Sequence, residues 1–177
     1  VVTSNPVGEV RTLMSGIIKM LSSVRNYVYL QTPYFMPNES FMLALKSAAL
    51  SGADVRLMIP EQCDNKIAGY ASRSYLGDLL EVGVKVYLYK DGFIHSKSIV
   101  CDDYISSVGS VNLDYRSFYY NFEVSAFVYD KSVAQELKNY FFEDIKHCRQ
   151  LTYSEYRNRS FGKRCVESCA RLLSPLM

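Results

Sequence analysis

The alternation of helix and strand patterns through the first ninety residues constrains the fold most strongly. Residues 9–24 have helical periodicity, with Val10, Leu13, Ile17, Met20 and Leu21 on one stripe. A short apolar run that is typical of a strand, Tyr27–Leu30, follows. The pattern then repeats with a helix capped by Asn38 and running to Leu50, a strand over Val55–Ile59, a helix over Asn65–Glu81 and a strand over Val84–Tyr89. Such alternation predicts an α/β layered domain.

The second half of the chain is richer in strand patterns. We expect strands at Ser98–Cys101, Tyr104–Val108 and Phe122–Tyr129, and helices over Ser132–Arg149 and Phe161–Leu173. A tight turn at Asp102-Asp103 would join the first two of these strands. Thr32–Pro37 is expected to be a loop, because its two prolines prevent regular strand pairing. Residues 1–150 would form one domain, and residues 151–177 an appended helical extension.

The number of cysteines and the apolar content both favour a chain that folds without disulfides. Of its 177 residues 49% are hydrophobic, enough to bury a sizeable core. The number of cysteines is odd and no C-x-x-C pair occurs, which favours a reducing compartment. We expect buried thiols rather than a zinc site, although His147 adjoins one cysteine and two others lie one helical turn apart. The five cysteines are Cys63, Cys101, Cys148, Cys165 and Cys169.

The charge is unevenly distributed along the chain. From Lys146 to the end there are seven basic and two acidic residues, whereas the first 145 residues carry a net charge of −3. A basic end suits an anionic partner such as a membrane surface or a phosphate, although a solvated helix face would have the same composition. No apolar run reaches the roughly 18 residues of a membrane span. The chain begins without Met or a signal peptide, so we expect a soluble piece of a longer protein.

The stretch from His95 to Glu123 concentrates side chains suited to phosphoryl chemistry. His95 and Lys97 are two residues apart, as are Ser110 and Asn112, and residues with this spacing in an extended chain face the same side. Lys97 supplies a point charge for phosphate oxygens, and Ser110 and Asn112 can donate hydrogen bonds to them. His95 can attack phosphorus or protonate a leaving oxygen.

Three further residues complete the predicted site. Glu123, on a separate strand, can hold the second imidazole nitrogen of the histidine. Gly109 is small enough to let a ligand approach the backbone. Asp102 is expected to have a structural role in the hairpin turn. No metal or other cofactor is expected, since lysine already supplies the positive charge.

The spacing H-x-K-x4-D-x6-G-S-x-N resembles the HKD motif of the phospholipase D superfamily. Four flanking segments are similar to the C-terminal half of bacterial cardiolipin synthases. These segments are Thr32–Pro37, Asn112–Phe118, Asn121–Val124 and Ala170–Leu176. The resemblance implies a phospholipase D-like layered domain, with a mixed β-sheet flanked by helices on both faces.

The resemblance also implies a reaction. Enzymes of this family carry two HKD motifs: one histidine forms a phosphohistidine, and the other protonates the leaving alcohol and activates the incoming one. In the synthase, one phosphatidylglycerol donates its phosphatidyl group to another, and glycerol is released. By this analogy His95 is the proton shuttle, Lys97 and Asn112 clamp the phosphate, Ser110 supports them and Glu123 orients the imidazole. Tyr34 and Phe35 would line a lipid-facing groove.

The chain contains only one HKD motif, and its other histidine, His147, has no lysine two residues later. Either an N-terminal half with its own motif is missing, or two copies of the chain pair. In the first case we expect an exposed apolar face where the missing half docks. The alternative functions are a homodimeric single-motif phosphodiesterase or nuclease, a phosphatidylserine synthase-like enzyme, and a catalytically silent lipid-binding half. Mixed charges around His95 argue against a nucleic-acid partner. The parent enzyme is expected at the cytoplasmic face of the cell membrane.

Overall fold

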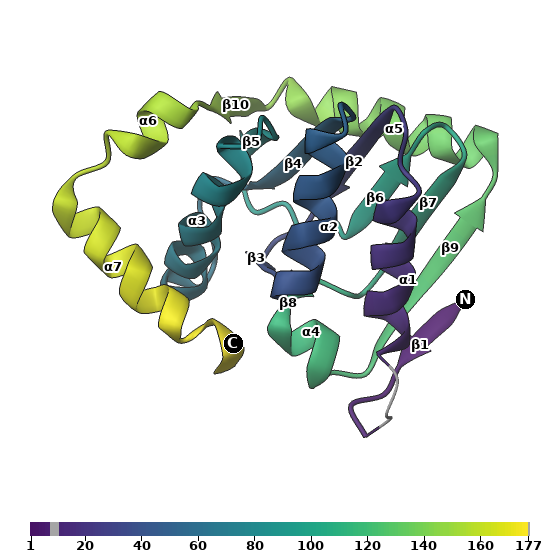
Figure 1. Ribbon diagram of the computed structural model, residues 1–177, viewed down its shortest axis with the longest axis horizontal. Helices are drawn as coiled ribbons and strands as arrows, with labels where there is room; N and C mark the ends of the chain where they lie inside the picture. Colours follow the sequence, from purple (N-terminus) through teal and green to yellow (C-terminus); the bar gives the residue numbers. More distant parts are fainter. Residues whose placement is uncertain (8–10, 177) are drawn as a thin grey trace.

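The computed structural model describes residues 1–7 and 11–176. Its centre is an eight-stranded sheet in the order β1-β9-β7-β6-β2-β4-β5-β10, and a second pair, β3-β8, lies apart from it (Figure 1). The strands are β1 Val2–Ser4, β2 Tyr27–Gln31, β3 Phe35–Met36, β4 Asp54–Pro60, β5 Lys85–Tyr89, β6 Ser98–Cys101, β7 Ile105–Gly109, β8 Leu113–Asp114, β9 Glu123–Tyr129 and β10 Cys148–Leu151.

Helices cover both faces of the sheet, as the sequence predicts. Figure 1 shows α1, α2 and α3 side by side on one face and α5 on the other. The first face buries the larger apolar core, and the second buries an aromatic cluster that includes Tyr29 and Phe141. The helices are α1 Thr12–Ser22, α2 Glu39–Leu50, α3 Lys66–Leu80, α4 Tyr115–Tyr119, α5 Lys131–Ile145, α6 Tyr153–Arg157 and α7 Phe161–Leu172, with a final 3₁₀ turn η1 Ser174–Leu176.

The sheet is mixed, because one half contains parallel strands and the other half antiparallel strands. Strands β2, β4 and β5 are parallel and are connected by α2 and α3, the expected result of helix–strand alternation. Strands β6, β7, β9 and β1 add antiparallel to the other side of β2. All five residues of β2 are buried, since this strand has a neighbour on each side and a helical layer on each face.

The prediction of a loop over Thr32–Pro37 is wrong in its centre. Phe35 and Met36 form β3, which pairs in parallel with Leu113 and Asp114 of β8. The prolines at positions 33 and 37 flank this pair, so the backbone N–H groups of both strand residues stay available. The pairing of β3 with β8 places the segment that follows β2 beside the segment that follows β7.

The expected helix over Ser132–Arg149 is also too long. It ends at Ile145, and Cys148–Leu151 forms β10, which pairs antiparallel with β5. The open edge of β5 provides hydrogen bonds that helical periodicity alone does not reveal. Strand β10 crosses the expected border at residue 150, and α7 packs on α3. The division into a domain and an extension remains a prediction.

Other expectations have mixed outcomes. The start of the first predicted helix, including Val10, lies outside the described residues. Cys101 is buried, but Cys165 and Cys169 are exposed, so the expectation of buried thiols is wrong for these two. They face outward because α7 packs on α3 through other positions. Within the described part of the chain, no helix is both long enough and apolar enough to cross a bilayer.

Asp102 connects the β6–β7 hairpin to the start of β2. Asp102 and Asp103 both have positive φ angles, the conformation that a tight hairpin turn requires and that Asp tolerates. The Asp102 carboxylate accepts hydrogen bonds from the backbone N–H groups of Arg25, Asn26 and Tyr27 at 2.7–2.9 Å. These three donors precede or begin β2, so the side chain has a structural task where the central strand starts.

Replacing Asp102 by Asn is expected to lower the free energy of unfolding by about 1–3 kcal/mol, because a neutral amide cannot accept three backbone hydrogen bonds as strongly as a carboxylate. Urea denaturation followed by circular dichroism measures this difference. Asp91→Asn is the matched control; its exposed carboxylate pairs with His147 at the surface, and we expect a change within about 0.5 kcal/mol. Equal stability of the two variants would contradict the anchoring role.

Candidate functional site

His95 and Lys97 lie in the extended segment immediately before β6 rather than on the strand. The hydroxyls of Ser96 and Ser98 both donate to the Gln31 side-chain oxygen, at 3.2 and 2.9 Å. Because side chains alternate in an extended chain, this anchoring directs His95 and Lys97 to the opposite side. The Lys97 Nζ donates to the His95 carbonyl oxygen at 3.0 Å. The shared orientation predicted from their spacing therefore has a physical cause.

The His95 imidazole is exposed and has an aromatic neighbour. Its ring centroid lies 5.6 Å from that of Phe93, which in turn lies 6.0 Å from that of Tyr34. The Tyr34 hydroxyl donates to the Asp64 carboxylate at 2.5 Å, and burial together with this contact raises the pKa of Tyr34. Among the described residues no side chain forms a hydrogen bond with the His95 ring, so both ring nitrogens are available to a reactant.

Glu123 gathers hydroxyl and amide donors from three segments. Its carboxylate accepts hydrogen bonds from Ser110, from Ser117 at 3.0 Å and from Asn121 at 3.1 Å. Ser110 is further held because its hydroxyl accepts from the Val124 N–H at 3.0 Å. The expected contact between Glu123 and the His95 ring is not among the hydrogen bonds of the described residues. Glu123 instead fixes the loops that present Ser110.

Lys97 is partly buried near the acidic groups of the site. Burial lowers the pKa of Lys97, while the carboxylates of Glu123 and Asp114 act in the opposite direction. The ammonium donates to the His95 carbonyl oxygen and forms no ion pair with a carboxylate among the described residues. A phosphate diester entering here would find a cation whose charge is incompletely neutralised by its surroundings.

Asn112 directly precedes β8, and Asp114 is the last residue of that strand. Asp114 is buried and caps α4 by accepting from the Ser117 N–H at 2.7 Å. Burial raises its pKa, and hydrogen bonds from Ser117 and Asn112 oppose this effect. The Asn112 Oδ1 is buried without a hydrogen-bond partner among the described residues, an uncommon state for a polar atom.

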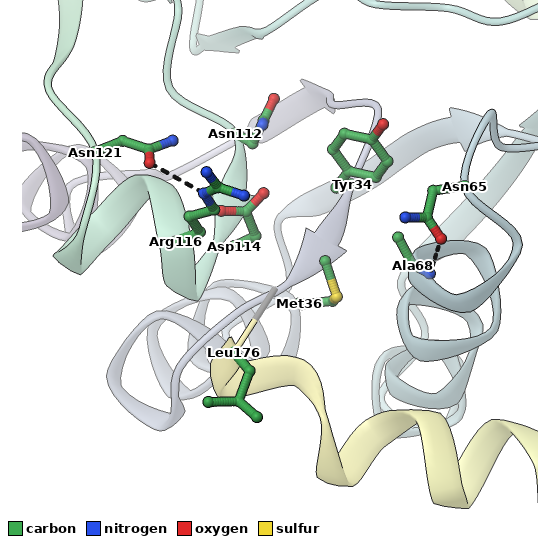
Figure 2. A pocket seen from close by; sticks show the side chains of 9 residues that line it. All are labelled: Tyr34, Met36, Asn65, Ala68, Asn112, Asp114, Arg116, Asn121 and Leu176. Atoms are coloured by element: carbon green, nitrogen blue, oxygen red, sulfur yellow. Dashed lines mark hydrogen bonds between the residues drawn. The ribbon is translucent and has the colours of Figure 1, made fainter.

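A cavity of about 340 Å³ opens beside Asn112 (Figure 2). Figure 2 shows Asn112 and Tyr34 near one end and Leu176, from the C-terminal 3₁₀ turn, at the other. The lining residues are Tyr34, Met36, Asn65, Ala68, Asn112, Asp114, Arg116, Asn121 and Leu176. His95 and Lys97 do not line it, so the cavity adjoins the motif rather than containing all of it.

Two of the three expected substrate-binding residues have other tasks. Phe35 is fully buried and packs against Phe41, so it belongs to the core and not to a lipid-facing groove. Gly109 is small because β7 and β9 approach closely. A Cβ atom there would lie 2.6 Å from the Ser125 Cα and would also clash with the Val124 carbonyl oxygen. Of the three, Tyr34 alone lines the cavity, and its role in substrate binding remains a prediction.

Ser117 is a residue of the candidate site that the sequence pattern did not single out. It contacts Glu123, Asp114 and the Asn112 N–H, which donates to its hydroxyl at 3.2 Å. The signal available in the sequence is the helix-capping pattern of Asp114 followed three residues later by Ser117. His147, the second histidine, is exposed and pairs with Asp91 at 2.5 Å, outside the cavity.

The chain is similar in sequence to known proteins named cardiolipin synthase. The family model described as cardiolipin synthase, phospholipase D-like domain, matches residues 17–145. The chain belongs to this family. Over all 177 residues it is 48% identical to the major cardiolipin synthase of Bacillus subtilis and 45% identical to a cardiolipin synthase of Listeria welshimeri. It spans 37% of the length of each of these relatives.

Solved structures of the superfamily share the fold. Nuc from Salmonella typhimurium, a phospholipase D family member, aligns with a TM-score of 0.70 at 19% identity, over 85% of this chain and 98% of that chain. Phosphatidylserine synthase from Haemophilus influenzae aligns with a TM-score of 0.73 at 18% identity, over 93% of this chain and 45% of that chain. The predicted phospholipase D-like layered fold is therefore confirmed.

Replacing Gly109 by Ala is expected to destabilise the protein by about 1–3 kcal/mol, because the added methyl group would force β7 and β9 apart. Thermal unfolding measures the effect. Gly162→Ala in α7 is the control, since a Cβ atom at that position would have no described neighbour within 4 Å and alanine favours a helix. If Gly109→Ala were as stable as the control, the close approach would not explain this glycine.

Proposed function

We propose that the chain is the C-terminal catalytic half of a bacterial cardiolipin synthase. The observation that carries this proposal is the identity of 45–48% along the whole chain to cardiolipin synthases, which includes the segment from His95 to Glu123. The reaction would transfer a phosphatidyl group from one phosphatidylglycerol to the terminal hydroxyl of another. The parent enzyme would act at the cytoplasmic face of the cell membrane.

The first step would form a phosphohistidine on the other half of the enzyme. A nitrogen of that histidine attacks the phosphodiester phosphorus, a P–N bond forms, and the P–O bond to the glycerol headgroup breaks. His95 protonates the departing oxygen, and glycerol leaves. The exposed imidazole of His95 supports this role, because its nitrogens are accessible to a reactant.

The second step would reverse these roles. His95, now neutral, takes the proton of the headgroup hydroxyl of a second phosphatidylglycerol. The resulting oxygen attacks phosphorus, the P–N bond breaks and cardiolipin forms. Lys97 and Asn112 would hold the phosphate oxygens in both steps, with Ser110 as a supporting donor. Glu123 would keep Ser110 in place through the hydrogen bond between them.

An apolar patch beside Ser110 supports a second half as the partner. Val108, Ser110, Phe122 and Val124 share one face at the β7–β9 end of the sheet, since each pair is two residues apart and Ser110 lies opposite Val124. The three apolar side chains are exposed. Burying them against a second domain would remove this area from water and bring a second motif close to His95.

The test is a headgroup-exchange assay on phosphatidylglycerol vesicles. The chain alone is compared with the chain mixed with a separately expressed N-terminal half that carries its own motif. We expect cardiolipin only from the mixture, because the double displacement requires two histidines. His95→Ala is expected to lower its rate at least about 10²-fold, the typical contribution of general acid–base catalysis. His147→Ala, the matched control, is expected to leave the rate unchanged.

Other results of this assay separate the alternatives. Cardiolipin from the chain alone would mean that two copies share one site, which sedimentation of the active species would reveal as a dimer. Exchange onto serine instead of phosphatidylglycerol would favour a phosphatidylserine synthase-like enzyme. An active mixture whose rate survives His95→Ala would overturn the proposed role of His95.

A further inference from the structure

Two charged side chains of helix α7, Glu167 and Arg171, contact the rest of the protein. Glu167 is 2% exposed and pairs with Arg159 at 2.6 Å. Arg171 pairs with Asp78 on α3 at 3.1 Å, and its guanidinium lies 4.2 Å from the Tyr75 ring centroid. An ordinary surface helix buries apolar residues and turns its charges to water. The inner face of α7 does the opposite for these two residues.

The outer face of α7 is apolar and exposed. Its stripe contains Phe161, Cys165, Cys169 and Leu172, and it continues into Leu176 of the 3₁₀ turn. These positions are three or four residues apart, so they follow one side of the helix. Phe161, Leu172 and Leu176 are each about 80% exposed. Side chains this large and this exposed along one line indicate a surface that meets another apolar phase.

Two basic residues lie near this stripe in the sequence. Arg164 is in the first turn of α7, and Arg157 ends α6. Neither forms an ion pair with a carboxylate in the described part of the chain. Lys163 lies on the other side of the helix, one turn before Glu167, and lines a cavity with Glu167 and Arg159. The segment from residue 146 onward has a net charge of +5, whereas the rest of the chain is net negative. The surface therefore combines an apolar stripe with a positive charge, which a zwitterionic or cationic partner would not complement.

We propose that the outer face of α7 and η1 binds the surface of an anionic lipid bilayer. The apolar stripe would enter the boundary between headgroups and acyl chains, and Arg164 and Arg157 would contact lipid phosphates. This is the arrangement of an interfacial amphipathic helix, here attached to a folded domain through its polar side.

The position of this surface connects it to the proposed reaction. Leu176 belongs to the apolar stripe and also lines the cavity beside Asn112 and Tyr34 (Figure 2). A bilayer in contact with α7 would therefore lie at one end of that cavity, where a lipid headgroup could enter without leaving the membrane. This connection rests on the proposed function, whereas the binding of α7 to anionic lipid does not.

Flotation with lipid vesicles tests the surface without any turnover. The unmodified chain is expected to float with vesicles containing phosphatidylglycerol or phosphatidylserine and not with pure phosphatidylcholine vesicles. Binding should weaken as salt is raised, because lipid phosphates attract the basic side chains. A polarity-sensitive maleimide probe on Cys169, with Cys165 replaced by Ser, should shift to shorter wavelength on the anionic vesicles only.

Substitutions on α7 and on α5, which lie on opposite sides of the molecule, are compared for their effect on vesicle binding. Phe161→Glu and Leu172→Glu are each expected to weaken partitioning into the vesicles roughly tenfold or more. Each replaces an apolar side chain that would be buried in the bilayer by a negative charge, which the anionic lipids repel. Both side chains are exposed, so the fold should survive. Tyr140→Glu on α5, across the sheet, places the same charge on another exposed aromatic residue and should leave partitioning unchanged.

The outcomes distinguish this surface from the proposed activity. Absence of binding to anionic vesicles, or binding that Phe161→Glu and Leu172→Glu do not weaken, would overturn the proposal. A probe shift produced by the added N-terminal half without lipid would assign the face to that protein instead. Vesicle binding without cardiolipin formation by the mixed halves would leave the surface in place and remove the proposed function.

Discussion

The pairing of β2 with β6 is the constraint on which the rest of this structure depends. Strand β2 is buried along its whole length, and its backbone groups are satisfied by β4 on one side and β6 on the other. Gln31 at its end holds Ser96 and Ser98, which sets the direction of His95 and Lys97. The same junction joins the parallel half of the sheet to the antiparallel half. A site assembled from both halves therefore depends on the most buried strand.

The candidate site is held by hydrogen bonds between segments far apart in sequence. Thr32, directly after β2, accepts the Leu113 N–H at 3.3 Å and so brings Asn112 to the end of the central strand. Glu123 and Ser117 connect β9 and α4 to the same place. These hydrogen bonds hold the segments around Asn112, Ser117 and Glu123 together. The His95 imidazole, by contrast, is exposed.

The two exposed apolar surfaces of the chain have different surroundings. The patch beside Ser110 adjoins the motif and the Glu123 carboxylate, which suits the interface with a second catalytic half. The stripe on α7 is bordered by basic residues that form no ion pair within the described chain, and it ends at the cavity, which suits an anionic bilayer. A half-enzyme between a protein partner and a lipid surface would have both, and charge is what distinguishes them.

Local sequence patterns were enough to predict the layered α/β fold, most element positions and the grouping of His95 with Lys97, because helical and strand periodicities and i, i+2 spacing are local properties. Features that depend on neighbouring segments could not be predicted in this way. Strands β3 and β10 form because a partner strand offers hydrogen bonds, and Gly109 is needed because β9 approaches it. Phe35 is expected in a groove from its sequence neighbours and lies in the core, since burial is a property of packing. Residue spacing places the apolar stripe of α7 on one side of the helix, but only the contacts of α7 with α3 decide that this side faces outward.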